Sequence, residues 1–249
     1  MITNIFQGGL GNQLFQVAAG LSFARDNNDS YVLNPATFLG MGQGRSIYHY
    51  LDTVFKNIDK GCFTCSNVYK EKTFAYNSIP YSGDMLLDGY FQSPKYFGKQ
   101  SSFIKNAFCF PQVGFQRKTC AIHVRLGDYM NSGFSLITPK YFADSIEYVR
   151  SREESIDFIV MTDSPQHVHN YLPTDLNYRF FENDELGQIA AMMASDYAII
   201  SNSTFGWWGS FLGKDKISIA PDKWGTERWF KDSSEYADIY RSDMIRIAV

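Results

Sequence analysis

Residues 120–128 read CAIHVRLGD, an apolar segment that runs directly into a polar turn. A short, continuous apolar run of this kind predicts a strand at 120–124, buried in a parallel sheet. Because side chains alternate along a strand, His123 and Arg125 project to the same side at its carboxyl end. The stretch therefore predicts a parallel α/β sheet with polar residues at the edge where such sheets bind ligands.

The chain after residue 119 continues this pattern. Further apolar runs predict strands at 156–161, 178–181, 197–200 and 217–220. Between them, apolar residues at helical spacing predict two buried helix faces, the first on Phe142, Ile146 and Val149, the second on Leu186, Ile189, Ala190 and Met193. Strands that alternate with helices are typical of βαβ units, so we predict a doubly wound domain.

The N-terminal part starts in a similar way and then becomes irregular. A strand at 2–6, a glycine turn and a helix with Leu14, Ala18 and Leu21 on one face are predicted. The stretch 76–94 is rich in Gly, Pro and aromatic residues, which favours loops and a binding rim. We therefore expect two α/β lobes, 1–115 and 116–249, of which the C-terminal lobe is the more regular.

Composition excludes several classes of protein. The 23 Lys and Arg against 26 Asp and Glu give 23 − 26 = −3, so no basic field favours nucleic acid as a partner. Four cysteines in 249 residues are not a disulfide scaffold. No apolar run approaches the ~18 residues of a membrane span, and no signal sequence is evident. A cytoplasmic protein is expected, and docking on the inner face of a membrane would leave no such trace.

The first motif, FQGGLGNQLFQ at 6–16, is a glycine-rich turn between a strand and a helix. Backbone N–H groups at such a helix start suit a phosphate, which makes Gly9, Gly11, Asn12 and Gln13 candidate ligand contacts. The third glycine of a dinucleotide fingerprint is replaced by Leu14. A purely structural turn with an Asn cap explains the motif equally well.

Two further motifs follow predicted strands. Arg125 offers a planar fork of donors suited to phosphate oxygens, unless it forms an ordinary ion pair with Asp128 while His123 is a core histidine. The segment SNSTFGWWGSF at 201–211 either caps a helix or presents polar groups to a phosphate. Its candidate contacts are Ser201, Asn202, Ser203, Thr204 and Phe205. Three polar turns between strands and helices predict convergence on an anionic nucleotide.

Metal-binding motifs have little support in the sequence. No Asp-x-Asp pair is present, and Cys62-x-x-Cys65 lacks a second pair at zinc spacing. We predict no metal site.

The three motifs, in this order and spacing, resemble the inverting α-1,2-fucosyltransferases of glycosyltransferase family 11 over almost the whole chain. The stretch Asp238-Ile239-Tyr240 near the end of the sequence also resembles the C-termini of family members. The resemblance implies a GT-B-like fold, two Rossmann-like lobes facing across a cleft, and a bacterial form without a membrane anchor. It implies GDP-fucose as donor and the 2-hydroxyl of a terminal β-galactoside as acceptor. Since the donor is a substrate, no cofactor and no metal are expected.

By position, the resemblance makes Arg125 the diphosphate clamp, with His123 beside it. Asn12 matches a donor contact, and Ser203 and Thr204 match residues near the phosphates. Leu126 stands where related sequences carry a second arginine, which puts a two-arginine clamp in doubt. The N-terminal lobe is then the acceptor side and the C-terminal lobe binds GDP-fucose.

Inversion at the anomeric carbon suggests one in-line displacement, in which a carboxylate takes the proton of the attacking hydroxyl. Asp128, Asp163 and Glu182 are the candidates, and Asp163 is equally suited to bind the guanine edge. Two other interpretations stay open: a GT-B transferase for another nucleotide sugar, and a catalytically silent nucleotide- or carbohydrate-binding module.

Overall fold

The computed structural model describes residues 1–40, 44–132 and 137–249. The chain forms two compact units. The first comprises Met1–Phe110 with Ser234–Arg241, and the second comprises Pro111–Ser233 with Ser242–Val249. The segment 234–241 thus belongs to the first unit. The predicted division, with a single boundary near residue 115, does not include this return of the chain.

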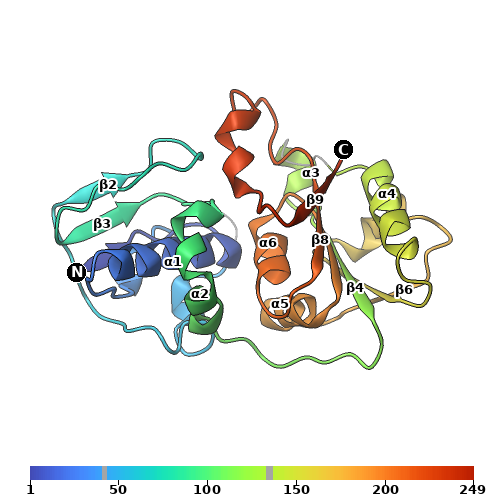
Figure 1. Cartoon of the computed structure of the whole chain (residues 1–249), viewed down its shortest axis with the longest axis horizontal. Coiled ribbons are helices and arrows are strands. Elements are labelled where there is room, and N and C mark those ends of the chain that lie inside the picture. The colour runs from blue at the N-terminus through green and yellow to red at the C-terminus, as the bar shows by residue number, and fades with distance from the viewer. Residues whose placement is uncertain (41–43, 133–136) are drawn as a thin grey trace. The chain divides into compact units, whose positions relative to one another are not determined.

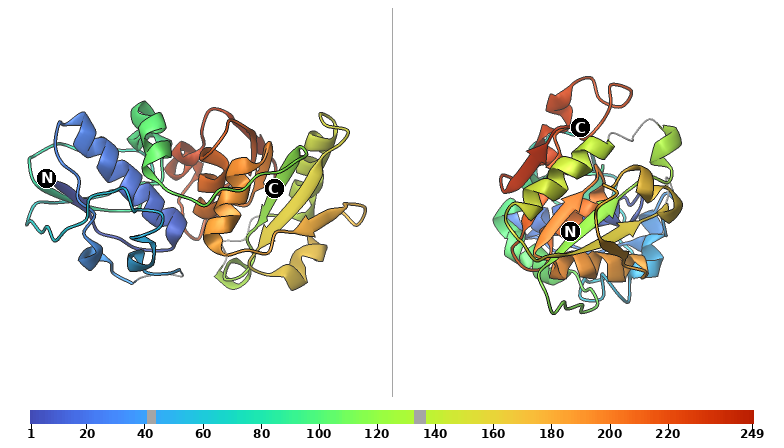
Figure 2. Two further views of the ribbon diagram at one scale, coloured as in Figure 1. Left: turned by 90° about the horizontal axis from the view of Figure 1, so that it is seen from below. Right: turned by 90° about the vertical axis from the view of Figure 1, so that its right-hand side faces the viewer.

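The second unit is built on a six-stranded, fully parallel sheet (Figures 1 and 2). Its strands in chain order are β4 (Thr119–Val124), β5 (Asp157–Thr162), β6 (Tyr178–Phe180), β7 (Tyr197–Ile200), β8 (Ile217–Pro221) and β9 (Met244–Ile247). Their order in the sheet is β6-β5-β4-β7-β8-β9. This is the doubly wound order of Rossmann folds, and the winding reverses between β4 and β7. The predicted doubly wound domain is confirmed.

Helices cover both faces of this sheet (Figure 2). They are α3 (Tyr129–Ser132), α4 (Pro139–Arg150), the 3₁₀ helix η5 (Pro165–Asn170), α5 (Glu185–Ala194) and α6 (Thr204–Phe211). The predicted face of α4 is confirmed, because Phe142, Ile146 and Val149 share one buried cluster with Ile122 and Val124 of β4. The alternate residue of β4, His123, lies against Gly206 of α6 on the other face.

The first unit has a smaller parallel sheet in the order β1-β3-β2. Its strands are β1 (Ile2–Asn4), β2 (Val68–Lys70) and β3 (Met85–Asp88). Two α-helices, α1 (Leu10–Asp26) and α2 (Ser101–Ala107), accompany 3₁₀ turns η1 (Pro35–Thr37), η2 (Ile47–Tyr50), η3 (Pro94–Tyr96) and η4 (Gly98–Gln100). Two more 3₁₀ turns, η6 (Ser233–Glu235) and η7 (Ala237–Ile239), lie in or beside the returning segment 234–241.

One expectation for this unit was wrong, and one was incomplete. The stretch 76–94 is not all loop, because β3 lies within it as the central strand and buries Met85 and Leu87. Helix α1 is present as predicted and buries Leu14 and Ala18 of the predicted face, but Gln13 and Gln16 on its other sides are equally buried. Helix patterning fails where an element is enclosed on nearly all sides.

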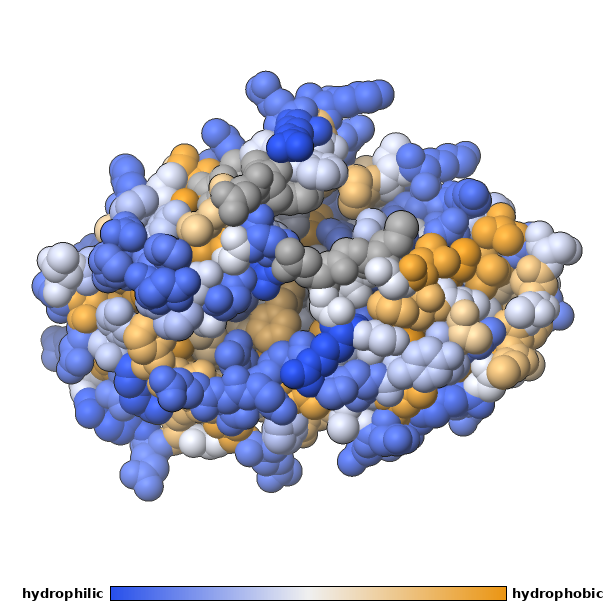
Figure 3. Space-filling view, turned by 180° about the vertical axis from the view of Figure 1, so that it is seen from behind, coloured by the Kyte–Doolittle hydropathy of each residue, from blue (hydrophilic) through white to orange (hydrophobic). Residues whose placement is uncertain are grey.

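Among the described residues, no helix is both long and apolar enough to cross a membrane. Figure 3 shows hydrophobic residues interspersed with hydrophilic ones on the face it presents.

Candidate active site

The carboxyl ends of β4 and β7 are tied together at the point where the winding of the sheet reverses. His123 pairs in register with Ile200, and Ser201 follows directly. The Ser201 hydroxyl donates to the His123 carbonyl oxygen at 2.8 Å and accepts from the Arg125 backbone N–H at 3.0 Å. Ser201 therefore fixes where Arg125 leaves the strand.

Arg125 is held by two carboxylates. Its Nη2 lies 2.5 Å from Asp128 Oδ1, and its Nη1 lies 2.8 Å from Asp163 Oδ2. The guanidinium carbon also lies 5.3 Å from the centre of the Tyr129 ring. The three charges sum to +1 − 2 = −1, and each of the three side chains is only about one quarter exposed. The ion pair with Asp128, which we weighed as an alternative to phosphate binding, is thus present.

Asp163, just beyond β5, has a second set of contacts. Its Oδ1 accepts the backbone N–H groups of Leu126 at 3.0 Å and Gly127 at 3.1 Å. One carboxylate thus shapes the turn after β4 and orients Arg125. This arrangement uses both of its oxygens.

His123 is buried and uncharged at neutral pH. Burial, assisted by the nearby Arg125 guanidinium, lowers its pKa to about 4. Within the described part of the chain, its Nδ1 has no hydrogen-bond partner. A Cβ on Gly206 would lie 2.7 Å from this nitrogen, so α6 approaches the imidazole as closely as it does because residue 206 is glycine. The Phe205 ring centre is 5.5 Å from the imidazole.

The start of α6 completes the group. Among the residues that the structure describes, Ser203, its N-cap, makes no side-chain cap hydrogen bond, so helix capping does not explain this hydroxyl. Asn202 is held by a hydrogen bond from its Nδ2 to the Trp224 carbonyl oxygen at 3.1 Å. Burial raises the pKa of Tyr129 to about 12, so the phenol stays protonated. Thr204 and Phe205 are partly exposed.

The glycine turn lies in the first unit and is built as a rigid loop. Gly8 has φ = +76°, a conformation that favours glycine. Gln13, fully buried, donates from Nε2 to the carbonyl oxygens of Gly8 and Arg45, both at 2.9 Å. Asn12 Oδ1 accepts from Gln92 Nε2 at 3.0 Å. Of the four predicted contacts, Gly9 and Asn12 are partly exposed, whereas Gly11 and Gln13 are buried.

The structure thus brings together some of the predicted site residues, all of them in the second unit. This group comprises His123, Arg125, Asp128, Asp163, Ser201, Asn202, Ser203, Thr204 and Phe205. The glycine-turn residues belong to the other unit, and Glu182 lies exposed after β6. Tyr129 was not assigned a role in the sequence. The feature of the sequence that could have indicated a role for Tyr129 is its position four residues after Arg125, at the start of a short helix.

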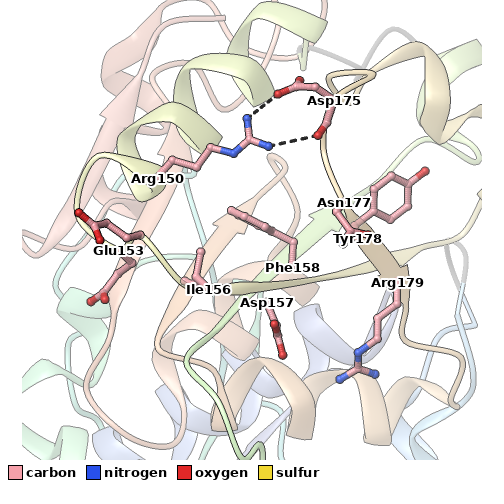
Figure 4. Close-up of a pocket in the computed structure, with 10 residues that line it drawn as sticks. Arg150, Glu153, Ile156, Asp157, Phe158, Asp175, Asn177, Tyr178 and Arg179 are labelled. Atoms are coloured by element: carbon pink, nitrogen blue, oxygen red, sulfur yellow. Dashed lines mark hydrogen bonds and ion pairs between the residues drawn. The ribbon is translucent and has the colours of Figure 1, made fainter.

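A pocket in the second unit lies elsewhere, at the amino ends of β5 and β6 (Figure 4). Two arginines and four carboxylates line it, and Arg150 pairs with Asp175 at 2.8 Å. Its lining consists of Arg150, Glu153, Glu154, Ile156, Asp157, Phe158, Asp175, Asn177, Tyr178 and Arg179. It contains none of the predicted site residues, and its acidic excess disfavours a phosphate.

Comparison with solved structures defines the fold class. The fucosyltransferase NodZ from Bradyrhizobium aligns over 85% of this chain and 92% of its own, with a TM-score of 0.57 and 9% identity. A NodZ alpha-1,6-fucosyltransferase soaked with GDP-fucose aligns with a TM-score of 0.52 and 11% identity, over 88% of this chain and 94% of its own. The fold is therefore GT-B-like, and the predicted fold class is confirmed.

Sequence comparison gives the family. The profile of glycosyl transferase family 11 matches residues 50–248. An alpha-1,2-colitosyltransferase from Escherichia coli is 24% identical over 87% of this chain and 90% of its own. A galactoside 2-alpha-L-fucosyltransferase from Caenorhabditis elegans is 24% identical over 98% of this chain and 76% of its own. The chain belongs to glycosyl transferase family 11 and is a glycosyltransferase, as its motifs predict.

Proposed function

We propose that this enzyme transfers L-fucose from GDP-β-L-fucose to the 2-hydroxyl of a terminal β-galactoside, with inversion and without a metal, in the synthesis of a glycan or surface polysaccharide. The observation that carries the proposal is the family match over residues 50–248. Two relatives carry an α-1,2 or 2-alpha linkage in their names. A third, 25% identical over 87% of this chain and 92% of its own, is the Escherichia coli O-antigen biosynthesis glycosyltransferase WbnK.

The donor diphosphate binds, in this proposal, at the carboxyl ends of β4 and β7. Ligands of doubly wound sheets bind where the winding reverses, and α6 begins there without a side-chain cap. Arg125 has five N–H groups and uses one on each of two carboxylates, so others remain for phosphate oxygens. These donors stabilise the charge that develops on GDP as the sugar departs.

Asp128 is the proton acceptor in this mechanism. A diphosphate on the remaining N–H groups of Arg125 competes with Asp128 for the positive charge of the guanidinium, because both are anionic, and this weakens the Asp128 ion pair. The competition releases the Asp128 carboxylate, which then takes the proton of the attacking hydroxyl. Asp163 remains in place, since its Oδ1 also accepts two backbone N–H groups, and acts as a positioning residue.

Asparagine substitutions separate these two roles. We expect Asp128→Asn to bind GDP several-fold more tightly, because a competitor for Arg125 has lost its charge. Its kcat at saturating donor should fall at least 100-fold. Asp163→Asn should instead raise the donor KM, because Arg125 loses its orientation. An Asp128→Asn enzyme with an unchanged kcat contradicts the assignment of the base.

Incubation with GDP-fucose, lactose and a chelator tests the whole reaction. The expected product is a 2′-fucosylated lactose that forms equally fast with and without EDTA, identified by linkage analysis. Stoichiometric GDP binding without transfer to any galactoside would favour a silent binding module instead.

A second candidate differs only in the donor sugar. The colitosyltransferase relative is named for a sugar other than fucose, and residues that bind phosphate do not distinguish sugars. Competition among GDP-fucose, GDP-mannose and UDP-sugars in the same assay would identify the preferred donor.

A further inference from the structure

The carboxyl edge of the first unit's sheet gathers side chains to which the proposed reaction assigns no role. Glu71 follows β2, residues 89–92 follow β3, and the glycine turn follows β1. Because the three strands are parallel, their carboxyl ends lie at one edge of the sheet. This is the edge at which open α/β sheets bind ligands.

Glu71 is the centre of this group. Its Oε2 accepts the backbone N–H groups of Tyr90 at 2.7 Å and Phe91 at 3.0 Å, and its Oε1 lies 3.1 Å from the same Phe91 nitrogen. A Cβ on Gly89 would lie 2.4 Å from the Glu71 Cβ, so the backbone is fitted closely around this side chain. Glu71 is nevertheless partly exposed, and a carboxylate has about four lone-pair positions, more than these three contacts use.

The turn that Glu71 holds is strained. Phe91 is fully buried with φ = +52°, in the left-handed region that bulky residues rarely adopt. Such strain persists where the surroundings fix it, and it is concentrated at ligand sites. The next residue, Gln92, donates to Asn12 of the glycine turn at 3.0 Å. The strained turn thus connects Glu71 with a predicted donor contact.

Aromatic rings belong to the same turn or pack against it. The rings of Phe74 and Tyr90 are nearly parallel, with 12° between their planes and 6.1 Å between their centres, and both are partly exposed. Tyr76 is 40% exposed and lies 4.8 Å from the Tyr96 ring. Aromatic rings offer apolar faces to the C–H side of a sugar, while a carboxylate accepts from its hydroxyls.

The segment 234–241 holds this group in place. Asp238 Oδ2 accepts the Tyr76 backbone N–H at 2.9 Å, and its Oδ1 pairs with Lys95 Nζ at 2.5 Å. The C-terminal motif at Asp238, Ile239 and Tyr240 thereby gains a function. Asp238 is a positioning residue that anchors the loop carrying Phe74 and Tyr76.

We propose that this edge is a pyranoside subsite for the acceptor, in which the Glu71 carboxylate accepts a hydrogen bond from a ring hydroxyl and Tyr90 with Phe74 flanks the apolar face. The inference rests on the proposed function for the identity of the sugar. A neutral hexopyranoside is the chemical class that fits, because its hydroxyls donate to a carboxyl oxygen and need no opposite charge from the protein.

Saturation-transfer NMR with lactose, N-acetyllactosamine and methyl β-galactoside measures binding without donor or turnover. We expect transfer to at least one sugar in the wild type, and at least a fivefold reduction in Glu71→Gln and Tyr90→Ala. Tyr81→Ala is the matched control, since Tyr81 is 46% exposed and precedes β3 at the opposite edge of the same sheet. Tyr90→Ala keeps the backbone N–H that Glu71 binds and is informative if Glu71→Gln does not fold.

Steady-state kinetics provide a second readout. In Glu71→Gln the acceptor KM should rise about tenfold, while the dissociation constant for GDP stays within twofold of wild type. The subsite would be overturned if no saturation transfer to any of the three sugars is seen, or if wild type and both variants bind the sugars equally. A wild type that binds these sugars but forms no fucosylated product refutes the proposed function and leaves the subsite standing.

Discussion

Gly206 offers a direct test of the packing around His123, because the wild-type contact leaves no space for a methyl group. A Cβ at position 206 lies 2.7 Å from His123 Nδ1 and 3.1 Å from the Ile200 Cβ, whereas an ordinary contact begins at 3.4 Å. The shortfalls are 3.4 − 2.7 = 0.7 Å and 3.4 − 3.1 = 0.3 Å. Neither neighbour moves easily, since His123 is buried and the Ile200 Cβ is fixed by β7.

Overpacking of this kind costs about 1–3 kcal/mol, and the gain in helix propensity from Gly to Ala is about 1 kcal/mol. Because neither neighbour yields easily, we expect an overpacking cost in the upper part of this range, about 2–3 kcal/mol, so that Gly206→Ala destabilises the second unit by about 1–2 kcal/mol, or roughly 2–8 °C in Tm. Because α6 must move away from His123, GDP affinity should fall as well.

Tryptophan fluorescence is the appropriate assay, because all four tryptophans lie in the second unit. Gly114→Ala is the control, since a Cβ there has no neighbour within 4 Å among the described residues and the position lies in the same unit. If Gly206→Ala melts no lower than Gly114→Ala and binds GDP as the wild type does, the close approach of α6 to His123 has no energetic importance.

Three further outcomes are expected. Arg125→Ala should lose about 100-fold in kcat, close to 3 kcal/mol of transition-state stabilisation; near-full turnover of the folded variant, measured with GDP-fucose and lactose, would contradict the clamp. Burial lowers the pKa of His123 to about 4. Above pH 6.5 the neutral imidazole therefore contributes about 3 kcal/mol to the free energy of unfolding, and this contribution is lost as the pH falls from 6.5 towards 4. Urea unfolding followed by tryptophan fluorescence should therefore show a steeper acid loss in wild type than in His123→Asn, and equal slopes would refute it. Burial, with Asp88 nearby, raises the pKa of Glu71 to about 7 despite two backbone N–H donors. Between pH 4.5 and 7 the native state therefore holds a proton that the unfolded chain releases. As the pH rises through this range, the free energy of unfolding of wild type should fall by up to about 3 kcal/mol relative to that of Glu71→Gln. Far-UV circular dichroism of thermal unfolding across that range measures the difference, and parallel curves would show that the carboxyl titrates normally.

Most of the second unit was predictable because its signals are local. The predicted strand at 197–200 coincides with β7, and the strand at 120–124 differs from β4 by one residue. The alternation of side chains along β4 correctly separates His123 from Ile122, which faces α4. Edge strand β9 was missed because an arginine interrupts its four residues, MIRI, whereas the four residues of β7, YAII, carry no charge.

The features that escaped prediction depend on contacts between distant residues. Strand β3 is a four-residue segment stabilised by β1 and β2 on either side, and neither partner is adjacent in sequence. The Glu71 contacts span 19 and 20 residues, and no spacing rule connects a glutamate with the backbone that it binds. In the second unit, Asp163 was recognised as a strand-end carboxylate, but its hydrogen bonds to Leu126 and Gly127 follow only from the pairing of β4 with β5.

The return of Ser234–Arg241 to the first unit has a practical consequence for anyone who recombines related enzymes. The polypeptide passes from one unit to the other three times, near residues 110, 233 and 241. A chimaera fused at a single point near residue 110 would combine one parent's Tyr76 and Lys95 with the other parent's Asp238, and mismatched partners there would loosen the loop that carries Phe74 and Tyr76. Exchange of an intact half between two parents therefore requires three junctions, and single-crossover libraries should be depleted of active members.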